Sequence, residues 1–248
     1  MDEFVDKVAL ITGAGRGVGR EIALAFSSLG AVVAVNDINP INLDNTVSEI
    51  LETGGNARAY VFDIAKRMPI EAMVAQVLEH FGRIDFLVNH ASVKPDAYLL
   101  KMDEWEFHRT LDVNLGGPFF AMQQVGRFMQ QQGGGAIVNL ISSVGQGHIQ
   151  KGHAALLASQ AGLIGLTYAA AQEFSPYNIR VNSVCHGSFE MDQLVSRSWD
   201  VVKLHRWLES FPQVRLGDHP DLVSLVLFLC SQAASSLTGQ VMSVDTEV

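Results

Sequence analysis

The amino-acid sequence predicts an α/β fold built on a doubly wound, seven-stranded parallel sheet. Short apolar runs rich in β-branched residues alternate with longer segments of helical periodicity along the chain. These runs are continuously apolar, as expected of strands buried on both faces between layers of helices. With 248 residues, of which 48% are hydrophobic, the chain can bury one large core, so residues 1–248 are predicted to form one domain.

The predicted elements follow one another without a break in this alternation. The expected strands are residues 7–12, 31–36, 57–62, 83–89, 136–141, 179–184 and 240–245. The expected helices are residues 17–29, 41–53, 69–81, about 103–131, 153–174, 192–211 and 219–233. The biased stretch QQQGGG at 130–135 is typical of a helix end followed by a turn.

Charge and cysteine content restrict the partners and the location. Lys and Arg number 17 against 26 Asp and Glu, and the resulting net charge of −9 disfavours nucleic acid and anionic membrane surfaces. Cys185 and Cys230 stand in apolar runs without metal-ligand or disulfide spacing, as expected of reduced core residues. The start MDEFVDKVAL has no basic leader, and no apolar run approaches the roughly 18 residues of a membrane span. We therefore expect a cytoplasmic protein.

A glycine motif, TGAGRGVG at 12–19, lies between the first strand and the first helix. Gly13, Gly17 and Gly19 permit a tight turn and close backbone approach, so that a pyrophosphate can sit on N–H groups at the helix start. A glycine pattern alone can mark an ordinary turn. Here Asp37 closes the second strand some 20 residues on, where an acid can hydrogen-bond a ribose diol. The sequence therefore predicts a dinucleotide site.

Two charged residues give opposite indications about which dinucleotide is bound. Asp37 would repel a 2′-phosphate, which favours NAD over NADP, whereas Arg16 could pair with that phosphate. We give Asp37 more weight because it would contact the ribose directly. Asp63, after the third strand, can hydrogen-bond adenine or can serve as the N-cap of the next helix.

Motifs spread over nearly the whole chain resemble those of the short-chain dehydrogenase/reductase family, its 3-oxoacyl-carrier-protein-reductase-like branch in particular. They are TGAGRGVG, VNHAS at 88–92, DVNLGGPF around Asn114, IVNLISS around Ser143, IRVNSVCHG at 179–187 and TGQVMSVD at 238–245. The resemblance implies a single-domain Rossmann fold. It also implies a set of cofactor-binding residues: Gly13, Arg16, Gly17, Val18, Gly19, Asp37, Asp63, Ile64, Asn89, Ala91 and Gly187.

The resemblance fails at the catalytic centre. In that family a serine positions the substrate carbonyl, a later tyrosine transfers the proton, and a lysine lowers the tyrosine pKa and holds the cofactor ribose. An asparagine on the fourth helix holds a water of the proton relay. Ser143 and Asn114 match, but Leu156 and Gln160 stand at the tyrosine and lysine positions. The resemblance therefore implies a degenerate active site.

Other family positions around the nicotinamide differ as well. His90 and Ser92 replace an asparagine and a glycine of the family motif, His186 replaces a proline, and Met191 replaces a threonine. The adenine end of the motif set is kept. We therefore expect the dinucleotide to bind more weakly and to be poorly oriented at its reactive ring.

Several residues are candidates for a substitute proton donor. His153 lies three residues before Leu156, so its imidazole could reach the vacated position, although a histidine there is more often a surface or helix-start residue. His148 and Lys151 fall in the preceding loop, where exposure is the simpler interpretation. His90 and His186 approach the nicotinamide by family analogy. Ser143 and Asn114 have structural interpretations too, as a strand-end serine and an amide that binds backbone.

Three functions remain open at this point. The first is a nucleotide-binding or partner subunit, acting alone or beside an active relative. The second is an active NAD(P)-dependent carbonyl or 3-oxoacyl reductase, or an alcohol dehydrogenase, with an unorthodox acid such as His153. The third is a nucleotide-sensing regulator without turnover. The segment 188–215 corresponds to the family's substrate lid and contains Phe189, Trp199 and Trp207. The family also implies a homo-oligomer, a tetramer, through the helices at about 103–131 and 153–174 and the last strand.

Overall fold

A computed structural model describes residues 3–142, 151–186 and 219–244. Its seven strands are parallel and form one sheet in the order β3-β2-β1-β4-β5-β6-β7. The strands are β1 (Val8–Thr12), β2 (Val32–Asp37), β3 (Asn56–Val61), β4 (Phe86–Asn89), β5 (Gly135–Ser142), β6 (Ile179–His186) and β7 (Val241–Ser243). The predicted fold class is confirmed.

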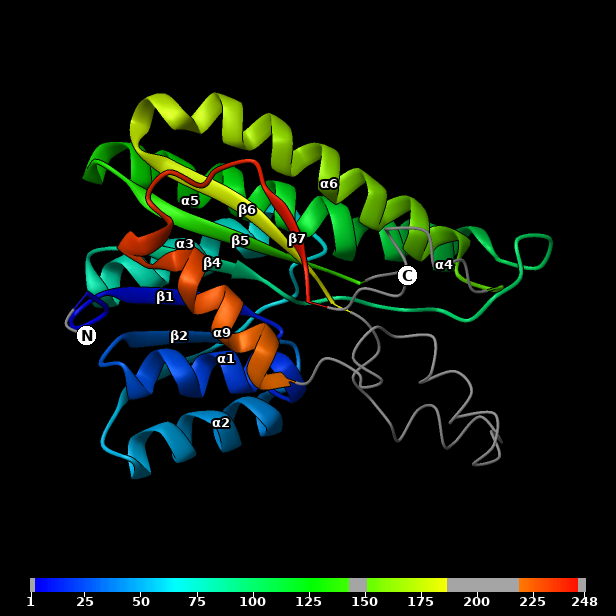
Figure 1. Ribbon diagram of the computed structural model, residues 1–248. Helices are drawn as coiled ribbons and strands as arrows, with labels where there is room; N and C mark the ends of the chain where they lie inside the picture. Colours follow the sequence, from blue (N-terminus) through cyan, green and yellow to red (C-terminus); the bar gives the residue numbers. More distant parts are fainter. Residues whose placement is uncertain (1–2, 143–150, 187–218, 245–248) are drawn as a thin grey trace, which may run out of the picture.

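Helices cover both faces of the sheet (Figure 1). One face carries α1 (Gly17–Ser28), α2 (Pro40–Glu52) and α9 (His219–Cys230). The other carries α3 (Arg67–Phe81), α4 (Glu104–Leu111), α5 (Gly117–Gln132) and α6 (Ala154–Phe174). The expected helix 192–211 and the segment 188–215 lie outside the described residues.

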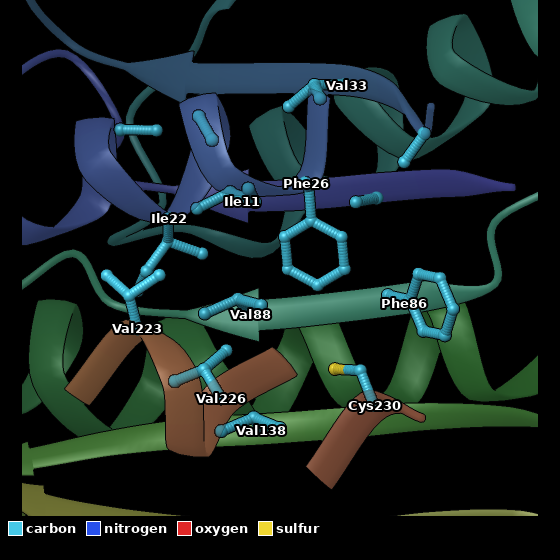
Figure 2. Packing of buried hydrophobic residues seen from close by; sticks show 14 of the residues in the cluster. Ile11, Ile22, Phe26, Val33, Phe86, Val88, Val138, Val223, Val226 and Cys230 are labelled. Atoms are coloured by element: carbon cyan, nitrogen blue, oxygen red, sulfur yellow. The ribbon is translucent and has the colours of Figure 1, made fainter. Parts of the chain in front are cut away.

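The sheet has a hydrophobic core on each side because both faces of its strands are apolar. In β1, Ala9 and Ile11 pack toward the α1 side, whereas Val8 and Leu10 pack toward the α5 side. Figure 2 shows Phe26 of α1 and Val226 of α9 lying over Val88 of the sheet. Such two-sided burial explains why the strands read as continuous apolar runs.

Element boundaries agree with the sequence-based expectation to within a few residues, but the expected helix at 103–131 is interrupted. A π-helical turn, Asp112–Gly116, separates α4 from α5, and Pro118 stands in the first turn of α5. Such turns insert one extra residue into a helix and often occur at functional sites. This turn contains Asn114.

One helix passes the length and composition test for a membrane span. Residues Ala154–Tyr177 have a mean hydropathy of 1.4 in their most apolar window. The expectation that no apolar run approaches this length is therefore wrong. In the fold, α6 packs on β5 and β6, and its residues Leu156 and Leu163 are buried. These contacts are those of a core helix.

Both cysteines are buried in the core. Burial raises the pKa of Cys185 to about 11 and that of Cys230 to about 12, the latter against an opposing effect of Arg180. Thiols with such pKa values are protonated and unreactive near neutrality.

Arg180 of β6 ties the sheet to the end of α9. Its guanidinium donates to the carbonyl oxygens of Leu229 and Ala234 at 2.5 and 3.1 Å, and to those of Cys230 and Ser231 at 3.2 and 3.1 Å. Leu229 and Cys230 are the last residues of α9, where carbonyl oxygens lack intrahelical donors. The carbonyl oxygens of Ser231 and Ala234 also accept the backbone N–H groups of Ala234 and Leu237 at 3.3 and 2.9 Å.

Removing this guanidinium takes the donor away from the carbonyl oxygens of Leu229 and Cys230 at the end of α9. We expect Arg180→Ala to lower the free energy of unfolding by about 2 kcal/mol and the Tm by roughly 4–8 °C. Thermal unfolding followed by circular dichroism measures this change. Lys101→Ala, at an exposed position, is the control and should leave the Tm nearly unchanged; equal Tm values for the two variants would contradict the assignment.

Candidate dinucleotide site

The carboxyl ends of the central strands meet where the strand order reverses. The chain moves outward from β1 through β2 to β3, and β4 then pairs on the opposite side of β1. In open α/β sheets, ligands bind in the crevice beside such a switch point. The glycine motif follows β1, Asp37 is the last residue of β2, and Asn89–Ala91 lie at the end of β4, so the structure brings these predicted site residues to one edge.

The glycine loop needs glycine for three different reasons. Gly13 has φ of 68°, and a Cβ there would lie 2.7 Å from the Cα of Ala91. Gly17 also has a left-handed φ, of 55°, but open space around it. A Cβ on Gly19 would lie 2.4 Å from the carbonyl oxygen of Gly13. Close packing therefore excludes a side chain at Gly13 and Gly19, whereas Gly17 requires glycine for its left-handed backbone conformation.

Hydrogen bonds hold the loop in shape without covering the start of α1. The Ala14 N–H donates to the Asn36 carbonyl at 2.9 Å, and the Thr46 hydroxyl donates to the Ala14 carbonyl at 3.2 Å. At the N-cap residue Arg16, no side chain caps the helix, and its first turn contains no acidic residue. The first N–H groups of α1 therefore suit an anion such as a pyrophosphate.

Asp37 lies at the end of β2 against this loop. Its Oδ2 accepts the Gly15 N–H at 3.2 Å, and its Oδ1 accepts the Asn39 N–H at 3.0 Å. The next residue, Ile38, is 60% exposed and brings no cation to this edge. Arg16, the N-cap residue of α1, is exposed. The position of Asp37 is that of an acid able to meet a ribose hydroxyl.

Asp63 follows β3 and is ion-paired. Its carboxylate accepts the Ala65 N–H at 2.9 Å and pairs with both terminal nitrogens of Arg109 at 2.9 and 3.3 Å. Burial raises the pKa of Asp63, but these donors outweigh it and hold the pKa below its usual value. The N-cap of α3 is Lys66, so the alternative interpretation of Asp63 as an N-cap is wrong.

The end of β4 closes the other side of the crevice. The Thr12 hydroxyl oxygen accepts the backbone N–H groups of His90 and Ala91 at 3.1 and 3.3 Å. Asn89 is buried, and its Nδ2 donates to Oδ1 of Asn139 at 2.8 Å. Its Oδ1 has no hydrogen-bond partner in the described part of the chain. This buried acceptor and the glycine cradle fit a bound dinucleotide.

Asn114 is fully engaged by protein atoms. Its Oδ1 accepts the Val93 N–H at 2.8 Å, and its Nδ2 donates to the Val93 carbonyl at 2.9 Å and to the Ser159 hydroxyl at 3.2 Å. The side chain is 1% exposed. The amide thus clamps the chain after β4, as the structural interpretation of this residue anticipates.

Leu156 and Gln160, which the family resemblance assigns to the tyrosine and lysine positions, form part of the core. Leu156 and Gln160 are each 2% exposed. The Gln160 Oε1 accepts the backbone N–H of Ser142 at 2.9 Å, and the Leu156 carbonyl accepts the Ser159 hydroxyl at 2.7 Å. Gln160 therefore holds the end of β5 in place.

His153 precedes α6 and does not lie within it. It is the N-cap residue, its backbone forms a bridge with Ala97, and it is 1% exposed. A surface position for this histidine is therefore wrong, and a helix-start position is correct. Lys151 is exposed.

The remaining predicted residues divide into two groups. Val18 and Ile64 are buried at 7% and 4% exposure and pack in the two cores, so only their backbones can face a ligand. Ser143, His148, Gly187 and Met191 lie outside the described residues.

Sequence reasoning missed Arg109, Thr46 and Ser159. Thr46 is a polar residue on the buried face of α2, which is a signal that could have been found. Arg109 and Ser159 bond to residues 46 and 45 positions away, and no local pattern indicates such pairs.

A cavity of about 560 Å³ lies at the opposite, amino-terminal edge of the sheet, away from these residues. Its Asp85 is already paired with Arg83 and Lys7, and its Arg180 binds helix-end carbonyls. The crevice at the carboxyl ends is therefore the better candidate site.

Comparison with known proteins gives consistent results. A family model described as enoyl-(acyl carrier protein) reductase matches residues 13–246. The 3-oxoacyl-[acyl-carrier-protein] reductase FabG of Thermotoga maritima is 37% identical over 96% of both chains. The FabG of Staphylococcus epidermidis strain RP62A is 38% identical over 97% of this chain and 98% of its own.

Among solved structures, an NAD⁺-bound xylitol dehydrogenase is similar, with a TM-score of 0.90 and 31% identity over 98% of this chain and 99% of its own. A 7α-hydroxysteroid dehydrogenase complexed with NADH and 7-oxo glycochenodeoxycholic acid has a TM-score of 0.89 and 33% identity over 98% of this chain and 94% of its own. Sequence, site geometry and relatives agree that this chain belongs to the short-chain dehydrogenase/reductase family of oxidoreductases.

Proposed function

We propose that this chain binds NAD(H) but has lost the family's standard proton-relay chemistry, and that it acts as a nucleotide-binding or partner subunit beside an active relative. One observation carries the proposal. Leu156 and Gln160 are buried, and the Gln160 amide oxygen is committed to the Ser142 N–H. These two residues of α6 therefore contribute to the packing of the core.

The loss of the phenol is a large chemical change. A free phenol titrates near a pKa of about 10, so action near neutrality requires a shift of roughly 3 units from a neighbouring cation. Leucine has no proton to transfer, and α6 contains no lysine. Its tyrosine, Tyr168, lies three turns further on and is 53% exposed. Removing a positioned general acid usually lowers the rate by roughly 10²–10⁴.

The dinucleotide end supports binding. The family binds an NAD(P) dinucleotide, and two structural relatives are complexes with NAD⁺ and NADH. In this chain, the N–H groups at the start of α1 would hold the pyrophosphate and Asp37 the adenosine ribose. When bound, the nicotinamide would supply or accept a hydride in the family's reaction, whereas the residues of this chain would hold the pyrophosphate and the adenosine ribose.

The absence of a cation after Asp37 favours NAD(H) over NADP(H). Arg20 of α1 is paired with Glu49, which leaves Arg16 as the nearby cation without an ion pair in the described residues. The Asp37 carboxylate would repel a 2′-phosphate at short range.

An active enzyme that uses His153 is the less favoured alternative. A general acid must come within hydrogen-bond distance of the substrate. His153 is buried at the start of α6, so its ring would have to leave the core to do so. A nucleotide-sensing regulator would use the same binding residues and would differ only in its partner.

A homo-oligomer remains a prediction. Phe119 and Phe128 of α5 and Tyr168 of α6 are 37–53% exposed. Burial of these side chains against a second copy, or against an active relative, would stabilise such an assembly.

The cofactor preference is testable at Asp37. By calorimetry, NADH should bind at least about tenfold more tightly than NADPH, because the carboxylate repels the 2′-phosphate. Asp37→Asn keeps an acceptor for the Gly15 N–H and should narrow the difference in affinity between NADH and NADPH. Asp37→Ala should narrow it as well and should bind both dinucleotides more weakly. Arg16→Ala is the matched control. A wild-type preference for NADPH of about tenfold or more would show that Arg16 decides the cofactor.

The chemical proposal is testable with acetoacetyl thioesters and simple ketones. We expect no useful turnover from the wild type, and partial recovery in Leu156→Tyr with Gln160→Lys, because the new lysine would lower the phenol pKa. Leu156→Tyr alone should do little. Recovery should remain incomplete, since Gln160→Lys also removes the acceptor of the Ser142 N–H; adding Met191→Thr should improve it.

Steady-state rates decide between the dead-site proposal and its alternative. His153→Ala should leave the wild-type rates at background. Robust wild-type turnover that disappears in His153→Ala would establish the histidine as a replacement acid and would overturn the proposal.

A further inference from the structure

His90 lies directly against the glycine loop. Its Nδ1 is 3.1 Å from the carbonyl oxygen of Gly13, and its backbone N–H donates to the Thr12 hydroxyl. A Cβ built on Gly19 would lie 2.5 Å from the same Nδ1, so the ring packs against the first turn of α1. The imidazole therefore connects the end of β4 with Gly13 and Gly19, at the two ends of the turn that would receive a pyrophosphate.

The contact with Gly13 fixes where protons can sit on this ring. A carbonyl oxygen only accepts hydrogen bonds, so Nδ1 carries hydrogen whether the ring is neutral or charged. Only Nε2 then gains or loses a proton. Protonation of His90 consequently adds a positive charge beneath the loop without breaking the Gly13 contact.

Charged and titratable groups face His90 from three other elements. Burial lowers the pKa of His90, the Gly13 carbonyl and Asp37 of β2 raise it, and His219 of α9 lowers it. His219 itself pairs with Glu21 of α1 at 2.6 Å. Because burial dominates, the ring is neutral in the ligand-free protein near neutral pH.

A pyrophosphate at the start of α1 would change this balance. Its negative charges would lie above the turn that the ring supports, and they would favour the imidazolium. A group whose pKa rises on binding takes up a proton at pH values between its free and bound pKa values, so affinity increases as pH falls through the pKa of the complex.

We propose, resting on the NAD(H) binding proposed above, that His90 is a positioning residue that holds the Gly13 carbonyl and takes up a proton from solvent when a dinucleotide binds. The imidazole thereby holds the glycine loop in both of its protonation states. Its positive charge is present only when the dinucleotide is bound. The affinity for the dinucleotide therefore depends on pH through His90, which supports the glycine loop, and not through the family's catalytic positions, Leu156 and Gln160.

The test is calorimetry of NADH binding between pH 6 and 8, in pairs of buffers with different ionisation enthalpies. We expect net uptake of a fraction of a proton, and an affinity about three- to tenfold higher at pH 6 than at pH 8. His90→Asn places an amide nitrogen at the position of Nδ1, one bond from Cγ, and has no titrating group. It should retain the affinity measured at pH 8 to within about threefold and lose both the proton uptake and the pH dependence.

Two histidine variants serve as controls. His108→Asn changes an exposed residue of α4 that pairs with Glu104, and it should leave the proton uptake unchanged. His219→Gln should shift the pH at which uptake occurs without removing it. If His90→Asn takes up as many protons as the wild type, or if wild-type affinity for NADH does not depend on pH, the inference is wrong while NAD(H) binding stands. If NADH binds at no pH, the proposed binding function itself fails.

A measurement on the wild type alone guards against a variant that does not fold. The NMR titration of the His90 ring should give a higher midpoint in the NADH complex than in the free protein. An unchanged His90 midpoint in the NADH complex would contradict the inference.

Discussion

The close approach of two backbone segments, at Gly13 after β1 and at Ala91 after β4, is the constraint on which the rest of the site depends. A Cβ on Gly13 would meet the Cα of Ala91 at 2.7 Å, and the Thr12 hydroxyl fixes the β4 end by accepting two of its N–H groups. This contact brings β1 and β4 together at the point where the strand order reverses. It sets where α1 begins, and therefore where an anion can bind.

The candidate site has two parts, which differ in whether their polar groups are available to a ligand. On the adenosine side, the loop, the start of α1 and Asp37 retain groups that can meet a ligand. At the positions that the family resemblance assigns to the nicotinamide side, the Asn114 side chain forms hydrogen bonds with Val93 and Ser159. The Gln160 side chain accepts a hydrogen bond from the Ser142 N–H. Groups whose hydrogen bonds are satisfied within the protein need no ligand to be stable. Asn114 and Gln160 therefore need no ligand to complete these hydrogen bonds.

Much of this arrangement could be predicted from the sequence because it follows from local patterns. Continuous apolar runs gave the strands, and glycine spacing with Asp37 indicated the dinucleotide crevice. Other features depend on tertiary contacts. The π-helical turn at Asn114 leaves no trace in an unbroken helical pattern, and the pairing of Asp63 with Arg109 spans the distance from β3 to α4. The sequence indicates a helix-start position for His153, but its burial and its backbone bridge to Ala97 depend on the tertiary fold.

The central claim is that this chain recognises the adenosine and pyrophosphate part of a dinucleotide and does not hold the nicotinamide for reaction. Calorimetry with ADP-ribose, which lacks only the nicotinamide ring, against NADH tests it most directly. We predict dissociation constants within about threefold of each other, since the ring would add little binding free energy. NADH binding roughly a hundredfold tighter than ADP-ribose would show that the nicotinamide is held firmly, and would contradict the account.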